Sequence, residues 1–231
     1  MFNKLKTGLM LGLFTAAVSA TAQAAPIQIG SFTSASGFYS YNNGSLTGTT
    51  PGAFDFSPEA EALLGAPAGT FLNATLTVNA TATGSITSTP LPSPPFPAGT
   101  IFLQQEFAGY IEIRDSGGAL LLRTDFSDSN LSGLQGGDTA LLSGATQTGA
   151  SISYSSAVLN TALLIDPQAF QFILTPTNPV LSVNGPNFTN FTAPDSANFS
   201  TDVTVAPEPG LLALFGLGLT AVGTMVRRRR A

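Results

Sequence analysis

The chain offers carboxylates, amides and hydroxyls for chemistry, and little else. Its 231 residues include no histidine and no cysteine, and its only lysines are Lys4 and Lys6. After Lys6, nucleophilic catalysis by a serine–histidine, cysteine–histidine or serine–lysine pair is excluded, as is Schiff-base chemistry on a lysine. Zinc, copper and haem sites lose their usual imidazole and thiolate ligands for the same reason. We therefore expect a protein that is not an enzyme.

A glycosidase is the catalyst that carboxylates alone could build, with two acids about 5 to 9.5 Å apart across a sugar-binding cleft. Glu106 and Glu112 belong to one expected strand and stand six residues apart in the sequence, which is about 20 Å at 3.3 Å per residue. A pairing with Asp125 or Asp128 from the neighbouring strand stays open. Sugar sites also favour flat aromatic platforms, yet the chain has no tryptophan and four tyrosines. Glycoside hydrolysis is therefore not the expected activity.

Asp125, Asp128 and Asn130 form a weak candidate for a metal site. Calcium prefers hard oxygen ligands, and these three side chains stand close together in the sequence before Gly133, in an expected loop. Their spacing does not match an EF-hand, so a solvated acidic loop is the simpler interpretation. We expect no bound cofactor.

The charge of the chain argues against a polyanionic partner. Of its 13 acidic residues only Glu208 lies outside residues 26–206, whereas only Arg114 and Arg123 of its eight cationic residues lie inside, so this segment carries a net charge of −10. Binding to a phosphate backbone needs basic side chains that neutralise it. Nucleic acid is therefore not an expected partner.

Alternation of apolar and polar residues predicts that strands carry these groups. From Leu72 to Ala82 every second residue is apolar, which is typical of a strand with one buried face. Residues 101–113 and 119–126 form an expected hairpin around the turn at 115–118. Further strands are expected at residues 27–33, 37–41, 151–155, 169–175, 180–183 and 197–205. This pattern predicts an all-β domain, an antiparallel β-sandwich or a jelly-roll-like fold.

One short helix interrupts the expected strands. Ser57 is its N-cap, Pro58 its first residue, Glu59 and Glu61 lie in its first turn, and Gly65 follows its end.

The first 24 residues have the features of a secretory signal peptide. Lys4 and Lys6 supply a positive start, residues 9–18 an apolar segment, and Ala22, Gln23 and Ala24 a small-residue cleavage site. We expect signal peptidase to cut after Ala24.

The C-terminus has the features of a sorting signal. An apolar run covers residues 211–226, which as a helix reaches about 24 Å and barely spans a hydrocarbon core of about 30 Å. Four arginines supply a cytoplasmic stop by the positive-inside rule; they are Arg227, Arg228, Arg229 and Arg230. An ordinary tail anchor would explain the helix and the arginines. It would not explain Pro207, Glu208 and Pro209 directly before them.

This tail closely resembles the bacterial PEP-CTERM sorting domain, which exosortases recognise. Pro207, Glu208 and Pro209 match its motif, residues 211–226 its membrane segment, and Arg227 to Arg230 its basic end. The resemblance implies export, transient anchoring in the inner membrane, and cleavage by an exosortase near the motif. It also implies release to the cell surface or to an extracellular polysaccharide matrix, such as that of a biofilm.

The expected organisation is a signal peptide at residues 1–24, an exported β-sandwich domain at 25–206 and a sorting signal at 207–231. We expect the domain to be a structural or adhesive protein without enzymatic activity. The alternative is a carbohydrate-binding module that contacts a matrix polysaccharide through Thr, Asn and Tyr side chains on a sheet face, with Tyr110 and Tyr154 as the tyrosines to test.

Overall fold

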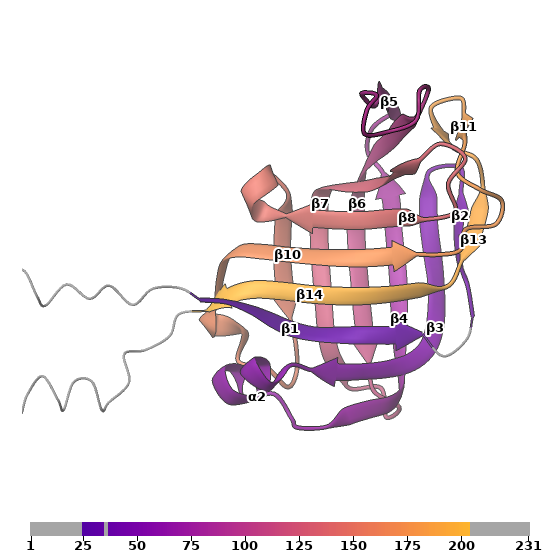
Figure 1. The fold of residues 1–231 in the computed structure, drawn as a ribbon. Coiled ribbons are helices and arrows are strands. Elements are labelled where there is room, and N and C mark those ends of the chain that lie inside the picture. Colours follow the sequence, from indigo (N-terminus) through magenta and orange to yellow (C-terminus); the bar gives the residue numbers. More distant parts are fainter. Residues whose placement is uncertain (1–24, 35–36, 204–231) are drawn as a thin grey trace, which may run out of the picture. The chain divides into compact units, whose positions relative to one another are not determined.

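Antiparallel strands make up most of the structure, a computed structural model that describes residues 25–34 and 37–203 (Figure 1). The expected signal peptide and the sorting tail, with Pro207, Glu208, Pro209 and Arg227 to Arg230, lie outside these residues. Within the described ranges no helix is long and apolar enough to cross a membrane.

Eight antiparallel strands form a closed barrel, in the order β1-β14-β10-β8-β7-β6-β4-β3, and β3 pairs again with β1. Their bounds are β1 (Ala25–Ser34), β3 (Ser45–Phe56), β4 (Thr70–Ala82), β6 (Ile101–Arg114), β7 (Leu120–Leu134), β8 (Ala140–Ala145), β10 (Leu164–Leu174) and β14 (Asp195–Val203). In Figure 1 strands β1, β14 and β10 cross in front of β4, β6 and β7 at a steep angle.

Shorter elements extend this barrel. Four strands add to its edges: β2 (Tyr39–Asn42) pairs with β3, β13 (Phe191–Ala193) with β2, β5 (Thr87–Pro90) with β6, and β9 (Ser151–Ser155) with β7. Strands β11 (Val183–Asn184) and β12 (Asn187–Phe188) form a separate small sheet. The helical elements of residues 25–34 and 37–203 are α2 (Pro58–Leu64), η1 (Thr146–Thr148) and η2 (Thr161–Leu163).

The all-β antiparallel class is confirmed, but the expected sandwich or jelly roll is wrong, because one sheet closes on itself. Closure depends on the pairing of β1 with β3, where two glycines allow the backbones to approach. A Cβ on Gly30 would lie 2.6 Å from the carbonyl oxygen of Asp55, and one on Gly52 would lie 2.3 Å from that of Thr33. No side chain fits at those distances, so these glycines make the closed ring possible.

Aromatic rings fill much of the interior. Tyr39 packs edge-on against Phe172 with ring centroids 5.0 Å apart, and Tyr41 stacks on Phe191 at 5.2 Å. Aromatic side chains bury about 150–250 Å² each, so this core can stabilise a chain that has no disulfide. The largest fully buried aromatic side chains are Tyr39, Tyr41, Phe32, Phe54, Phe107, Phe170, Phe172, Phe188 and Phe199.

The predicted strands agree with the structure except at particular positions. The alternating segment is β4, and the hairpin is β6 with β7. The alternation predicts that Leu72 lies on the buried face, but its side chain is 69% exposed. The cause is Asn73, whose left-handed φ of 60° coincides with a register shift between β3 and β4 and reverses the phase of the residues before it.

Other strand boundaries differ more. Residues 180–183 were expected to form a strand, but only Val183 belongs to one, in β11. Strands β3 and β8 were not expected at all. The inward positions of β3 include Thr50 and Gly52 beside Leu46 and Phe54, so its apolar alternation is interrupted.

One stretch of the barrel wall is closed without a backbone ladder. Strand β7 bends at Asp128, which has a φ of 53°, so that residues 123–127 pair with β9 and residues 130–133 pair with β8. Among the described strands β9 pairs with β7 alone. Across the gap to β10 and β14, the buried Tyr154 hydroxyl donates to the Ala169 carbonyl oxygen and lies 3.2 Å from that of Ser200.

Helix α2 begins and ends as predicted. Ser57 Oγ accepts a hydrogen bond from the Ala60 amide at 3.1 Å, and Gly65 adopts a left-handed φ of 70° after the last turn. The Ser57 hydroxyl also donates to the carbonyl oxygen of Gln28 in β1, so this single side chain joins the helix to the barrel.

We expect Ser57→Ala to lower the free energy of unfolding by about 1–2 kcal/mol, because it removes the N-cap and the bond to β1 together. Urea denaturation followed by circular dichroism measures this loss. Ser57→Thr keeps the hydroxyl and serves as the control. A Ser57→Ala protein as stable as the wild type would contradict the assigned cap.

Candidate functional site

Polar side chains form two rows across five neighbouring strands on the outer face of the barrel. Residues paired across strands on one face of a sheet stand about 4.5–5.5 Å apart at their Cβ atoms. The register of β3, β4, β6, β7 and β9 therefore makes each row continuous. The first row is Thr49, Thr77, Glu112, Arg123 and Ser155, and the second is Thr47, Asn79, Tyr110, Asp125 and Ser153.

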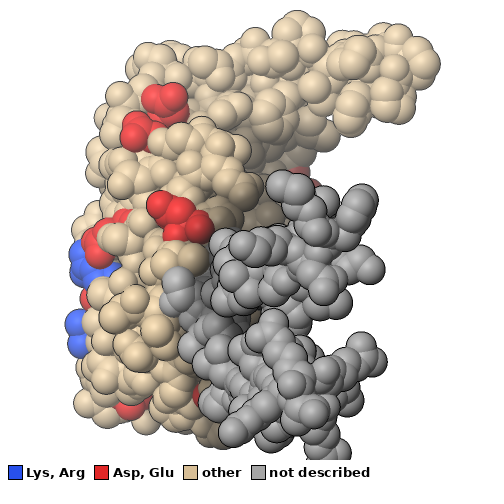
Figure 2. All heavy atoms as spheres, turned by 90° about the vertical axis from the view of Figure 1, so that its left-hand side faces the viewer, with Lys and Arg blue, Asp and Glu red and all other residues tan. Residues whose placement is uncertain are grey.

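The charged groups in these rows form ion pairs with one another and with the neighbouring Arg114. Glu112 bonds to Arg114 Nε at 2.6 Å and to Arg123 Nη1 at 3.2 Å, while Arg123 Nη2 lies 2.6 Å from Asp125 Oδ1. The hydrogen bond from Arg114 is the main reason that the pKa of Glu112 is lowered. Figure 2 shows the two arginines beside acidic groups at one edge of the view. This ion-pair cluster of Glu112, Arg114, Arg123 and Asp125 can thus contact a neutral partner without presenting a large net charge.

Neither tyrosine proposed for sugar contact offers a free ring. Tyr110 lies on the outer face as expected, but the guanidinium of Arg123 stacks on it with Cζ 4.0 Å from the ring centroid. The expectation for Tyr154 is wrong, because it points inward, is 8% exposed and uses its hydroxyl in the barrel wall. It shares its strand face with the buried Ile152.

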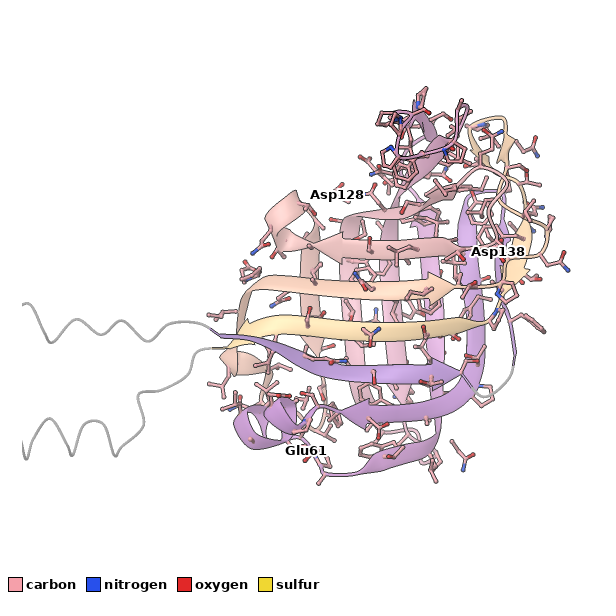
Figure 3. All side chains as sticks on the ribbon, in the orientation of Figure 1. Glu61, Asp128 and Asp138 are labelled. Carbon is pink, nitrogen blue, oxygen red and sulfur yellow. The ribbon has the colours of Figure 1, made fainter. Side chains whose placement is uncertain are left out.

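The candidate calcium ligands lie on strand β7, not in a loop. Asp125 is bonded to Arg123, and Asp128 accepts a hydrogen bond from the hydroxyl of Ser127 at 3.0 Å. The described residues contain no group of three acidic side chains that could hold a metal ion. In Figure 3 the labelled Glu61, Asp128 and Asp138 stand in separate parts of the molecule.

The two acids considered for glycosidase chemistry stay on the outer face of β6. Glu106 is exposed and pairs in register with Asn130 on β7, whereas Glu112 is opposite Arg123. A glycosidase pair could instead combine Glu112 with Asp125, and these two acids lie on the neighbouring strands β6 and β7. There Arg123 forms an ion pair with each of the two carboxylates.

Asp195 is the acid with the most altered environment. It is 9% exposed at the start of β14, and burial raises its pKa to about 7, an effect that the Thr50 hydroxyl only partly opposes. Thr50 Oγ1 lies 3.3 Å from Asp195 Oδ1 and 2.7 Å from the hydroxyl oxygen of Tyr39, which lies 2.8 Å from the carbonyl oxygen of Leu76.

The neutral form of Asp195, which burial favours, completes a chain of hydrogen bonds in the core. The chain from Asp195 through Thr50 and Tyr39 to the Leu76 carbonyl contains three links, but the two hydroxyls supply two protons. A protonated Asp195 supplies the third, and every link is then a hydrogen bond. This network lies in the core and ties β14 to β2, β3 and β4.

A polar pocket of about 410 Å³ lies where the β2–β3 turn, the end of β4 and β12 meet. Asn43, Thr81, Thr83, Ser85 and Asn187 contribute amide and hydroxyl groups to its wall. Behind it lies Gln105 of β6, which is 1% exposed. Sequence reasoning missed Gln105, although its odd-numbered position between Leu103 and Phe107 places it on the buried face of the strand.

No known protein family, characterised protein or solved structure matches the chain.

Proposed function

We propose that this protein is an exported, non-enzymatic structural or adhesive component of the cell envelope or of an extracellular polysaccharide matrix. The observation that carries the proposal is the order of the C-terminal groups: Pro207, Glu208 and Pro209, then the apolar run 211–226, then four arginines. With the signal peptide, this order supports delivery through the inner membrane by signal peptidase and an exosortase. The membrane contact ends when the tail is removed.

The described domain supports a role without catalysis. Its core is packed with aromatic side chains, and Glu112 and Asp125 on neighbouring strands are both bonded to Arg123. The rows of hydroxyl, amide and paired charged groups across β3, β4, β6, β7 and β9 provide a polar face for adhesion to a hydrated matrix.

We expect the form recovered from the cell surface to lack Arg227 to Arg230, because cleavage near Pro207 removes everything after it. Intact-mass spectrometry of the surface fraction measures the missing tail. The double variant Pro207→Ala, Glu208→Ala should instead accumulate in the inner membrane with the tail attached.

A matched control changes the same residue types within the folded domain. Pro58 and Glu59 are exposed in the first turn of α2, and the double variant Pro58→Ala, Glu59→Ala should be processed like the wild type. Surface-associated protein that still carries the four arginines would contradict exosortase processing.

A second function, carbohydrate binding by the same domain, is favoured by the pocket of about 410 Å³ lined by amides and hydroxyls. Amide and hydroxyl groups both donate and accept hydrogen bonds, as the hydroxyls of a sugar require. Because Tyr154 is buried and Arg123 covers one face of Tyr110, sugar contact fits this pocket better than the two tyrosines.

A further inference from the structure

The pocket beside Asn43 is positioned by a rigid turn. Asn42 and Ser45 pair across β2 and β3, so Asn43 and Gly44 form a two-residue hairpin loop. Their φ values of 47° and 86° are those of a type I′ turn, which favours Asn-Gly. The backbone N–H of Asn43 donates to Asn190 Oδ1 at 3.0 Å, and the backbone N–H of Ala82 donates to the Gly44 carbonyl oxygen at 2.7 Å. The turn is therefore held against both of its neighbours.

A chain of hydrogen bonds runs from the core to this turn. The buried Tyr41 hydroxyl donates to Gln105 Oε1 at 2.9 Å, and Gln105 Nε2 donates to Asn187 Oδ1 at 2.6 Å. Asn187 Nδ2 then donates to Asn43 Oδ1 at 3.3 Å. Each group accepts from the core side and donates toward the pocket, so the bonds polarise one another in one direction.

Backbone carbonyls fix the direction of this chain. Gln105 Nε2 lies 3.0 Å from the carbonyl oxygen of Gly84 and 3.4 Å from that of Pro186. Only the nitrogen of the amide can face carbonyl oxygens. Asn187 must therefore present its oxygen to Gln105 and its nitrogen to Asn43. No described residue accepts a hydrogen bond from Asn43 Nδ2, so the chain ends on a donor at the pocket.

The charges around the pocket define the class of ligand. Arg114 and Arg123 are the only cationic side chains between residues 25 and 203, and both belong to the ion-pair cluster on β6 and β7. Glu106 borders the pocket, since its Oε2 lies 3.4 Å from where a Cβ on Gly84 would stand. A carboxylate with no cation nearby accepts hydrogen bonds from hydroxyls and repels phosphates and uronic acids.

We propose that this pocket binds a neutral saccharide, with Asn43 Nδ2 donating to one hydroxyl oxygen and the hydroxyls of Thr81 and Thr83 contacting its neighbours. This inference rests on the proposed carbohydrate-binding function and assigns it to a site. Gln105 is a positioning residue, because it is buried behind the pocket and holds Asn187, which lies in the pocket wall and donates to the side chain of Asn43.

Isothermal titration calorimetry on the purified full chain tests the proposal with cellohexaose and maltohexaose as neutral probes and with an oligogalacturonate as the anionic comparison. The variant Asn43→Asp keeps the turn and the acceptor for Asn187 but replaces the donor by a charge. Asn43→Gly keeps the turn and removes the side chain. We expect both to weaken binding of the neutral probe about tenfold or more.

Asn160→Asp is the matched control, because Asn160 is exposed, makes no side-chain cap bond and does not line the pocket. It should bind like the wild type. Circular dichroism melting of each variant confirms that it is folded. The assignment would be overturned if the wild type bound neither neutral probe, if both Asn43 variants bound the neutral probe as tightly as the wild type, or if the wild type preferred the oligogalacturonate. Failure of tail processing with intact sugar binding would reject the sorting proposal alone.

Discussion

Leu76→Asp should unfold the protein, whereas Thr77→Asp on the next residue should leave it folded. Leu76 is 0% exposed in β4 and packs inside the closed barrel. An unpaired carboxylate there costs several kcal/mol, a large part of the stability of a domain of this size. Urea denaturation followed by far-ultraviolet circular dichroism should show no cooperative transition for Leu76→Asp.

Thr77→Asp should lower the free energy of unfolding by a smaller amount, and the register of β4 with its two neighbouring strands explains why. Thr77 lies on the outer face between Thr49 on β3 and Glu112 on β6. The Oγ1 atoms of Thr77 and Thr49 are 2.9 Å apart. Losing that hydrogen bond and placing a second acid beside Glu112 should cost about 1 kcal/mol. Thr75→Asp faces Arg114 instead and should be the milder variant. Equal damage from Leu76→Asp and Thr77→Asp would mean that the register assigned to β4 is wrong.

Asp195→Asn should stabilise the protein at pH 8 by up to about 4 kcal/mol. The pKa of Asp195 rises from an ordinary 3.8 to about 7 in the folded protein, chiefly through burial. Between these values the folded state holds a proton that the unfolded state has lost. The stabilisation that the bound proton gives to the folded state is therefore fully present below pH 4, falls as the pH rises, and is gone above pH 7.

An asparagine at position 195 carries a hydrogen-bond donor at every pH, whereas the aspartic acid carries one only while it is protonated. The Nδ2 of that asparagine can donate to Thr50 Oγ1 and complete the chain to Tyr39. Chemical denaturation of both proteins at half-unit steps from pH 4 to pH 9 measures the effect. The difference between variant and wild type should grow up to about pH 7 and then level off. A difference that is constant over this range would show that Asp195 is ionised throughout.

Local patterns predicted the parts of the fold that depend on neighbouring residues. The hairpin of β6 and β7 and the ends of α2 follow from alternation, turn residues and caps within short segments. Closure of the ring was not predictable in this way. Closure depends on Gly30 in β1 and Gly52 in β3, which are separated in the sequence. Each glycine lets its own strand approach the backbone of the other strand, and this contact forms only in the folded ring.

Sequence reasoning failed for two polar residues, Gln105 and Tyr154, because both lie on buried strand faces. Gln105 shares the inward phase of Leu103, and Tyr154 shares that of Ile152. Strand phase alone would have placed both side chains inside. The pairing of Gln105 with Asn187 could not follow from spacing, since they come together only where the barrel end meets β12.

The gap in the wall between β9 and β10 gives the barrel an uneven resistance to local unfolding. Elsewhere neighbouring strands of the ring are joined by backbone ladders, but here the side chain of Tyr154 bridges to β10 and β14. Opening this stretch breaks few hydrogen bonds and leaves the β6–β7 and β3–β4 ladders intact. Amide protons around Ser151–Ser155 should therefore exchange with solvent well before those of the central strands. Thermal fluctuations of the wall thus start at β9, while the ring that carries the pocket stays closed.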